Sequence, residues 1–336
     1  MCRSRLEKTE KQWIIIKQRG AGRPAFCGRA KMTQFIDRVL RNLSWFERLF
    51  SVPATPLPDA RDMENLIGQP DHLFLGFYDE QMLTERLEHY GILGKLREQG
   101  IDDLSVKLDT HDPEHQVMRL FSDQGEHPQL LGEAIYHIGA FRTRAPFARM
   151  LHGHRFNMLF IQWMLLQNPF EPFSERRPQL PGQNHPGLHI GREIIATLQA
   201  ILERLQFDGI LVSPEFAHNA LMYRPYFQYV SPITQGRMTA LRRDLADLTL
   251  AEAAWGIELG CIRDKNTEEI FRWVHDEMCL PRHPRLKTFF SSAAFQRQVE
   301  QTAEKTQFFF DRRLFEHLYP ERDTLEAGDS NPADGE

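Results

Sequence analysis

The sequence is poor in the features that mark several common classes of protein. Only four of its 336 residues are cysteine, and Cys2, Cys27, Cys261 and Cys279 form no C-x-x-C pair. This spacing argues against a disulfide scaffold and against a cysteine-rich zinc site. We also find no secretory signal, so we expect a reduced, cytoplasmic protein.

The chain also lacks a long hydrophobic run and an excess of basic residues. Its longest apolar run, from Phe156 to Phe170, contains Gln162 and Gln167 and is too short and too polar to span a bilayer. Lys and Arg number 41 against 46 Asp and Glu, a net charge of −5. We therefore expect no membrane partner and no nucleic-acid partner. There is no G-x-S-x-G elbow of an α/β-hydrolase and no H-E-x-x-H zinc motif.

Charge divides the chain into a core with different ends. Residues 1–31 carry nine Lys or Arg and two Asp or Glu. We interpret them as a basic disordered arm or as residues ahead of a translation start at Met32. Residues 32–69 are expected to form a helix, at 33–50, and a proline-marked linker. The acidic segment 320–336 is expected to be disordered.

The middle of the chain, 70–232, has the patterns of an α/β or α+β core. Leu104, Val106 and Leu108 alternate with polar residues, which is typical of a half-buried strand. We expect strands at 72–78, 104–109, 115–121, 129–139 and 156–167, and a helix at 80–98. After a long loop, the pattern predicts a helix from 190, a strand at 209–214, a short helix at 215–224 capped by Ser213, and a strand at 226–230.

The long loop ends in glycines at the entrance to a strongly amphipathic helix. Gly187 and Gly191 let backbone N–H groups approach a ligand, and the start of the helix carries partial positive charge. Together with Arg192, these features suit a phosphate or pyrophosphate. The loop matches neither the G-x-G-x-x-G fingerprint nor the P-loop, and an ordinary turn is the alternative interpretation.

The segment 155–231 resembles the GNAT acetyltransferases. Gly187, Ile190, Gly191 and Arg192 match the family's acetyl-CoA loop and the helix that follows it. The next strand, the short helix with Asn219 and Tyr223, and the strand after it follow the family's order. Asn184 stands where the family has Gln or Arg, and His189 stands at its second Gly or Ala position.

The resemblance implies a mixed central sheet flanked by helices, in which two parallel strands, about 158–166 and 209–213, splay apart. It implies acetyl-CoA as cosubstrate and an amine, of a small molecule or a protein, that attacks the thioester directly. Tyr223 matches the family's usual acid, and Glu133 and Glu215 are candidate bases. The residues implied in coenzyme binding are Leu165, Leu166, Asn184, Gly187, Leu188, His189, Ile190, Gly191, Arg192 and Asn219.

Two other functions stay open. His189 in the glycine loop favours a non-catalytic protein that kept the fold and binds a ligand or partner. A metal-dependent hydrolase would use His185, His189 and Glu193, whose spacing is interrupted by Pro186 and Gly187; we expect no metal.

The C-terminal part, 233–319, is predicted to be a mostly helical extension, with helices at 235–248, 250–260 and 286–318 and a strand at 269–280. Its aromatic group Phe308, Phe309 and Phe310 is expected to pack in the core or at the surface of a homodimer.

Overall fold

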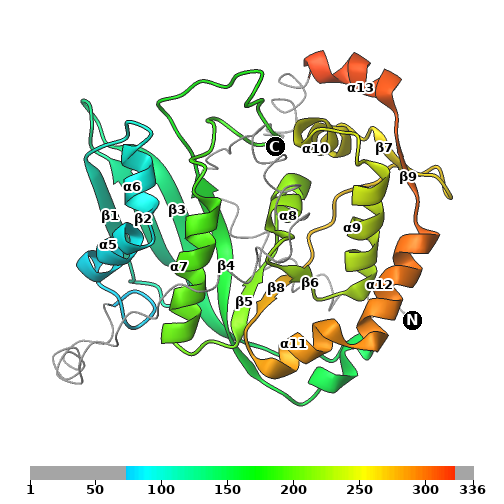
Figure 1. The fold of residues 1–336 in the computed structure, drawn as a ribbon, viewed down its shortest axis with the longest axis horizontal. Helices are drawn as coiled ribbons and strands as arrows, with labels where there is room; N and C mark the ends of the chain where they lie inside the picture. The colour runs from blue at the N-terminus through cyan, green and yellow to red at the C-terminus, as the bar shows by residue number, and fades with distance from the viewer. Residues whose placement is uncertain (1–72, 322–336) are drawn as a thin grey trace, which may run out of the picture.

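The computed structural model of the chain describes residues 73–321, which hold a mixed α and β fold (Figure 1). The predicted basic arm, the helix at 33–50, the linker and almost all of the acidic segment lie outside these residues.

A seven-stranded sheet with the order β1-β2-β3-β4-β5-β8-β6 forms the centre of the fold. All neighbouring strands are antiparallel except β4 and β5, which are parallel. The predicted strands at 104–109, 115–121, 129–139 and 156–167 are confirmed. The strands are β1 (Leu104–Asp109), β2 (Gln116–Ser122), β3 (Gln129–Phe141), β4 (Phe156–Leu166), β5 (Gly209–Val212), β6 (Gln228–Tyr229) and β8 (Met278–Pro281).

Helices pack along this sheet and around its second half (Figure 1). Helix α7 lies against β4, and its Leu198, Ile201 and Leu202 are buried in the main core, as the apolar stripe predicts. Helix α7 spans Gly191–Arg204. The other α-helices of the described residues are α5 (Glu80–His89), α6 (Ile92–Arg97), α8 (Ala217–Tyr223), α9 (Pro232–Asp244), α10 (Leu250–Glu258), α11 (Pro284–Ser291), α12 (Ala293–Lys305) and α13 (Arg312–Leu318). Two short 3-10 helices are η3 (Pro146–Leu151) and η4 (Tyr319–Glu321).

Strand β8 shows how the C-terminal segment joins the core. It lies between β5 and β6, although about fifty residues separate it from β6 along the chain. The chain leaves the sheet after β6, forms α9, α10 and the small strand β7 (Ile262–Asp264), and then returns. The segment 233–319 therefore supplies a strand of the central sheet as well as helices.

Three sequence predictions are wrong in detail near the N-terminal end of the described residues and before α8. Of the strand expected at 72–78, the described residues 73–78 form a tight turn closed by a Phe74–Tyr78 bridge, because Gly76 takes a φ of 70° that a strand does not allow. The single helix at 80–98 is two helices, since Gly91 has a φ of 75° and breaks the first. Helix α8 is preceded by Phe216 as its N-cap, not by Ser213.

The C-terminal predictions also need correction. Of the strand expected at 269–280, only its last residues belong to a strand, β8. The helix expected at 286–318 is broken after α12 by β9 (Phe308–Phe310), which pairs with β7. Phe308 is buried in the main core, so three consecutive aromatic residues pack as a strand rather than as a helix face.

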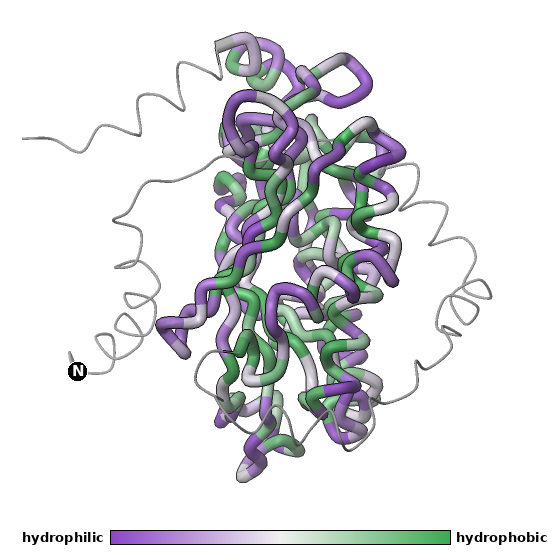
Figure 2. The backbone as a smooth tube through the Cα atoms, turned by 90° about the vertical axis from the view of Figure 1, so that its left-hand side faces the viewer, coloured by the Kyte–Doolittle hydropathy of each residue, from purple (hydrophilic) through white to green (hydrophobic). Residues whose placement is uncertain are grey.

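Hydropathy follows this architecture. The segments that run through the middle of the molecule are largely hydrophobic, and hydrophilic residues gather in the loops at its ends (Figure 2). Among residues 73–321, no helix combines the length and the apolar character that crossing a bilayer requires.

Candidate functional site

The parallel strands β4 and β5 pair over only four residues and then separate. Their registered partners run from Met158 and Gly209 to Ile161 and Val212, where β5 ends. Strand β4 continues to Leu166 and keeps its pairing with β3. A bulge occurs at this point, because Tyr136 faces Ile161 whereas Ile135 faces Trp163, which leaves Gln162 as the extra residue of β4. The edge of β4 beyond Ile161 therefore turns away from β5.

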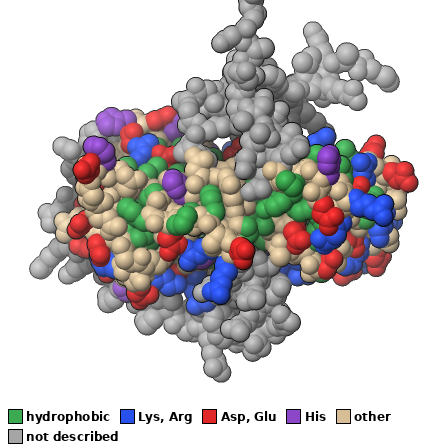
Figure 3. Space-filling model, turned by 90° about the horizontal axis from the view of Figure 1, so that it is seen from above, with side chains coloured by type: hydrophobic (Ala, Val, Ile, Leu, Met, Phe, Trp, Pro, Cys, Tyr) green, Lys and Arg blue, Asp and Glu red, His purple; other side chains and the backbone are tan. Residues whose placement is uncertain are grey.

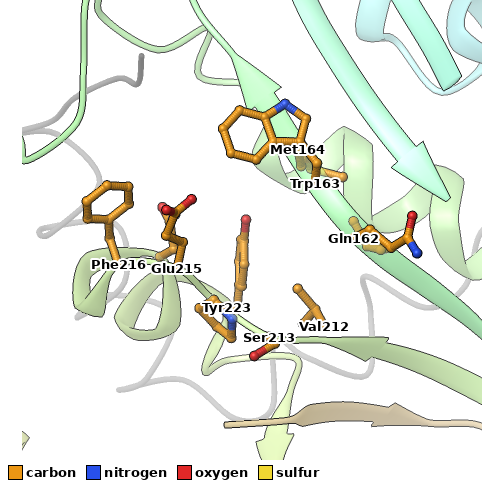
Figure 4. A pocket seen from close by; sticks show the side chains of 11 residues that line it. Gln162, Trp163, Met164, Val212, Ser213, Glu215, Phe216 and Tyr223 are labelled. Carbon is orange, nitrogen blue, oxygen red and sulfur yellow. The ribbon is translucent and has the colours of Figure 1, made fainter. Parts of the chain in front are cut away.

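A pocket occupies the opening between the two strands (Figure 4). Its volume is about 50 Å³, which suits a head group of a few atoms rather than a whole cofactor. The lining residues come from β4, from the end of β5 and the turn after it, and from α8: Ile161, Gln162, Trp163, Met164, Val212, Ser213, Pro214, Glu215, Phe216, Asn219 and Tyr223.

The pocket brings together three of the residues chosen from the sequence. Glu215 lies in the turn after β5, and Asn219 and Tyr223 lie one helical turn apart on α8, so both face the opening. Asn219 is buried and Tyr223 is half-buried. Figure 4 shows the Tyr223 hydroxyl and the Glu215 carboxylate directed toward the same space.

Glu133, the other candidate base, lies outside the pocket. It sits on β3, opposite Leu165 of β4. Its carboxylate accepts a hydrogen bond from Arg119 Nε at 2.7 Å and forms an ion pair with that side chain. The structure thus gives Glu133 a cross-strand partner on the sheet and places Glu215 at the opening.

The start of α7 lies beside this site. The partly buried ring of Tyr226, three residues after Tyr223, is within electrostatic reach of Arg192 and Glu193 in the first turn of α7. Burial raises the pKa of the Tyr226 phenol above its usual value. Behind the pocket, burial likewise raises the pKa of Tyr136, and the nearby Tyr223 adds to this shift.

The N-terminus of α7 has features of an anion site. Its N-cap residue, Ile190, provides no side-chain hydrogen bond to the first turn, and a Cβ added at Gly191 would meet open space. The first N–H groups of the helix point out of this end, where the helix dipole favours negative charge. The negative carboxylate of Glu193, in the first turn, would repel a bound anion. Its charge is partly neutralised, because the carboxylate forms an ion pair with Lys95 Nζ at 2.7 Å.

The other residues implied in coenzyme binding differ in how far their side chains are buried. The side chains of Leu165, Leu188 and Ile190 are buried, so they have only backbone groups to offer, and Leu166 is partly buried against the main core. Asn184 is exposed and Gly187 is half-buried. These placements fit a ligand held by the backbone of the loop more than by its side chains.

His189 takes a φ of 57°, in the left-handed region that favours glycine. Its backbone therefore has the conformation that a glycine would adopt at this place in the loop. The residue adds an imidazole whose Nε2 is buried.

Residues 167–190 form a long connection that extends over α8 toward α10 (Figure 1). Trp255 Nε1 of α10 donates a hydrogen bond to the Gln179 carbonyl at 2.9 Å, and Leu180 packs against α10. Gly182 packs so closely on Phe216 that a Cβ there would lie 2.5 Å from the ring. The loop is thereby fixed on both α10 and the wall of the pocket.

Within the described part of the chain, no group of three His, Cys, Asp or Glu side chains is arranged to hold a metal ion. His185 and His189 lie in the loop, and Glu193 is paired with Lys95. The residues suggested for a metal hydrolase do not form a metal centre here.

Most residues of the pocket wall lie outside the sequence predictions. The sequence predictions did not include Gln162, Trp163 and Phe216 among the site residues, although Gln162 interrupts the apolar run of β4 just before Trp163. That interruption could have indicated the site, because a polar side chain is uncommon in a buried strand unless it faces an opening.

No protein-family model matches the chain, and no curated protein matches it in sequence. Function is therefore inferred from the residues and geometry of the site itself.

Proposed function

We propose that the protein is an acyl-CoA-dependent N-acyltransferase that transfers an acetyl group to the amine of a small molecule or a protein. The observation that carries the proposal is the separation of β4 from β5, with Glu215 and Tyr223 facing the opening. The resemblance to the GNAT acetyltransferases leads to an expectation of two splayed parallel strands at these positions.

The acyl donor would be held by backbone groups. The free edge of β4 beyond Ile161 offers N–H and C=O groups to the amides of the pantetheine arm. The uncapped first turn of α7 would take the pyrophosphate, with Gly191 allowing close approach and Arg192 adding positive charge. The residues present fit this donor, since Ile190 gives the first turn no side-chain cap and a Cβ at Gly191 would meet only open space.

The chemistry needs a base and an acid at the opening. Glu215 would remove the proton that the amine loses as its nitrogen bonds to the thioester carbon. Tyr223 would protonate the thiolate sulfur as the carbon–sulfur bond breaks. The two side chains come from different elements and face one space, so both steps can occur at one bound thioester.

Isothermal titration with acetyl-CoA and with free coenzyme A tests the donor site. We expect micromolar binding of both, because the pyrophosphate and pantetheine are common to them. Gly191→Asp should weaken this binding by placing a carboxylate at the anion site. Gly191→Asn, whose side chain has the shape of Asp without its charge, should preserve the binding. Equal affinity of the wild type and the Asp variant would contradict the site, and no binding by folded protein would contradict the proposal.

A second candidate function is a non-catalytic protein that binds the same kind of ligand. The observation that favours it is His189, which adds an imidazole with a buried Nε2 next to the proposed anion site. Binding of acetyl-CoA without acetyl transfer to any amine in a broad screen would favour this second function.

A further inference from the structure

We propose that the end of the molecule opposite the pocket binds the phosphate backbone of a nucleic-acid duplex, without reading its sequence. The inference goes beyond acyl transfer and does not depend on it, because this surface lies at the start of β4, whereas the pocket lies toward the end of that strand. We call the surface the basic face, and its cations are Arg142, Arg144, Arg149, Arg155, Arg285 and Lys287.

The first part of the basic face is the connection between β3 and β4. The pairing of these strands ends with Phe141 opposite Phe156. The next residue on each strand, Arg142 and Arg155, therefore leaves the sheet at the same end. All four arginines of the connection are exposed, and no Asp or Glu occurs from 134 to 170. The connection thus presents four positive charges with no acid of its own.

Helix α11 supplies the second part of the basic face. Leu286 of α11 and Leu151 of η3 are buried in the same cluster, and Arg285 Nη1 donates a hydrogen bond to the Met150 carbonyl at 3.3 Å. Figure 1 shows α11 at the lower end of the molecule, beside the connection between β3 and β4. No Asp or Glu occurs from 278 to 299. Two acid-free segments, far apart in the chain, are therefore packed side by side.

The cations of α11 stand where a helix disfavours positive charge. Arg285 and Lys287 lie among the first four residues of α11, and its first turn holds no acidic residue. The start of a helix carries partial positive charge, so acidic side chains are favoured there and basic ones are not. Positive charge accumulates here at a cost in stability, and a bound anion would relieve that cost.

The basic face is not neutralised by the described part of the chain. None of its six cations forms an ion pair with a carboxylate of residues 73–321. Asp208 lies near the start of β4, where its carboxylate accepts a hydrogen bond from the Asn157 N–H at 2.7 Å. Its one charge leaves most of the positive charge uncompensated. The opposite end of the molecule, seen from above in Figure 3, mixes acidic, basic and hydrophobic side chains in its described part.

The composition of the basic face favours phosphates of a duplex over other anionic partners. Arginine supplies five of its six cations, and the guanidinium pairs with two phosphate oxygens at once. The connection and α11 hold no Trp or Tyr, and Phe147, Phe289 and Phe290 are buried or partly buried. Membrane surfaces are anchored by exposed aromatic rings, and single strands stack their bases on them. Met150 is exposed, but one methionine gives little area for insertion into a bilayer.

The average charge of the chain conceals this surface. A net charge of −5 led us to expect no nucleic-acid partner. A duplex contacts one side of a protein, however, so the charge of that side decides whether phosphates are attracted. The acidic remainder of the chain would turn the basic face toward the duplex.

Titration of the full chain into a fluorescent DNA duplex of about twenty base pairs, at several salt concentrations, tests the inference by anisotropy. The combined variant Arg142→Gln, Arg144→Gln and Arg149→Gln should bind at least tenfold more weakly than the wild type. The slope of log K against log salt should become shallower by about 3, since each lost phosphate contact contributes about 0.9. Lys287→Gln alone should reduce the slope by about 0.9.

The matched control removes the same charge elsewhere. The combined variant Arg176→Gln, Arg242→Gln and Arg313→Gln changes three exposed cations outside the basic face and should keep the wild-type affinity and slope. The basic residues in 1–31 are the same in all these proteins, so the difference between the two combined variants reports on the basic face.

Three results would overturn the proposal. The first is no binding of the duplex by folded wild-type protein, and the second is an equal loss of affinity in the two combined variants. The third is tighter binding to polyglutamate or to phosphatidylserine vesicles than to the duplex, which would assign the basic face to an acidic protein or to a membrane.

Discussion

Ile161 and Val212 are the last pair of residues at which the parallel strands β4 and β5 face each other. Immediately beyond this pair, Gln162 bulges from β4 and Pro214 follows the end of β5. Proline has no N–H to continue a ladder, and the bulge turns the facing strand. The opening between the strands is thus set by two local interruptions at the same level of the sheet.

The first prediction concerns the Tyr223 hydroxyl. Tyr223→Phe should lower kcat for acetyl transfer by about 10²-fold, because an acid that protonates the leaving group is lost. The affinity for acetyl-CoA should change little, since the ring remains. Steady-state kinetics with titration of the donor measures both quantities.

Tyr226→Phe is the matched control, because Tyr226 follows the same helix but does not line the pocket. It should keep full activity. An unchanged kcat in Tyr223→Phe would remove Tyr223 as the acid.

The second prediction concerns His189. If its imidazole crowds the anion site, His189→Gly should raise the affinity for coenzyme A about fivefold, which corresponds to about 1 kcal/mol of relieved crowding. The left-handed φ of 57° suits glycine, so the variant should fold without loss of melting temperature.

His189→Ala removes the ring but keeps a Cβ in the left-handed conformation, so it should bind coenzyme A at least as well as the wild type and melt at a lower temperature than His189→Gly. Weaker coenzyme binding by both variants would show that the imidazole contacts the ligand and would contradict the crowding.

The third prediction concerns acid stability at the end of α9. The Asp244 carboxylate is paired with Arg243 and accepts a hydrogen bond from the Phe308 N–H at 2.8 Å. Burial alone would raise the pKa of Asp244, but these hydrogen bonds outweigh it and hold the pKa below the ordinary 3.8. A depressed folded-state pKa gives stability that is present above about pH 4 and is lost as the pH falls through the folded value.

Asp244→Asn should therefore lower the free energy of unfolding at pH 7 by about 1–3 kcal/mol. The difference from wild type should shrink as the pH approaches 3. Denaturant unfolding at a series of pH values measures it, with the exposed Asp247→Asn as control. A difference that is constant with pH would contradict an ionised Asp244 as the stabilising group.

Local patterns were sufficient for much of the fold. The alternation at Leu104, Val106 and Leu108 predicts β1, and the stripe on α7 predicts its buried face, because both depend on side chains that repeat within a few residues. The same reasoning placed Glu215, Asn219 and Tyr223 close together, since a strand, a turn and a short helix follow one another directly in sequence.

Other features depended on residues far apart in the chain. The position of β8 between β5 and β6 is set by backbone pairing with strands about sixty-five and about fifty residues earlier in the chain, which no local period encodes. Phe308–Phe310 could fit a helix or a strand by composition, and pairing with β7 decided for the strand.

The sequence by itself determined β1 to β4, the amphipathic helix α7, the glycine-bearing loop before it and three of the side chains at the opening. Only the tertiary structure distinguished between the two candidate bases, Glu215 and Glu133. Glu215 faces the pocket, whereas Glu133 is paired with Arg119 across the sheet. It also brought Trp163 and Phe216 to opposite sides of one space. Such neighbours are set by the divergence of two strands, which depends on the packing of the whole sheet and not on any one segment.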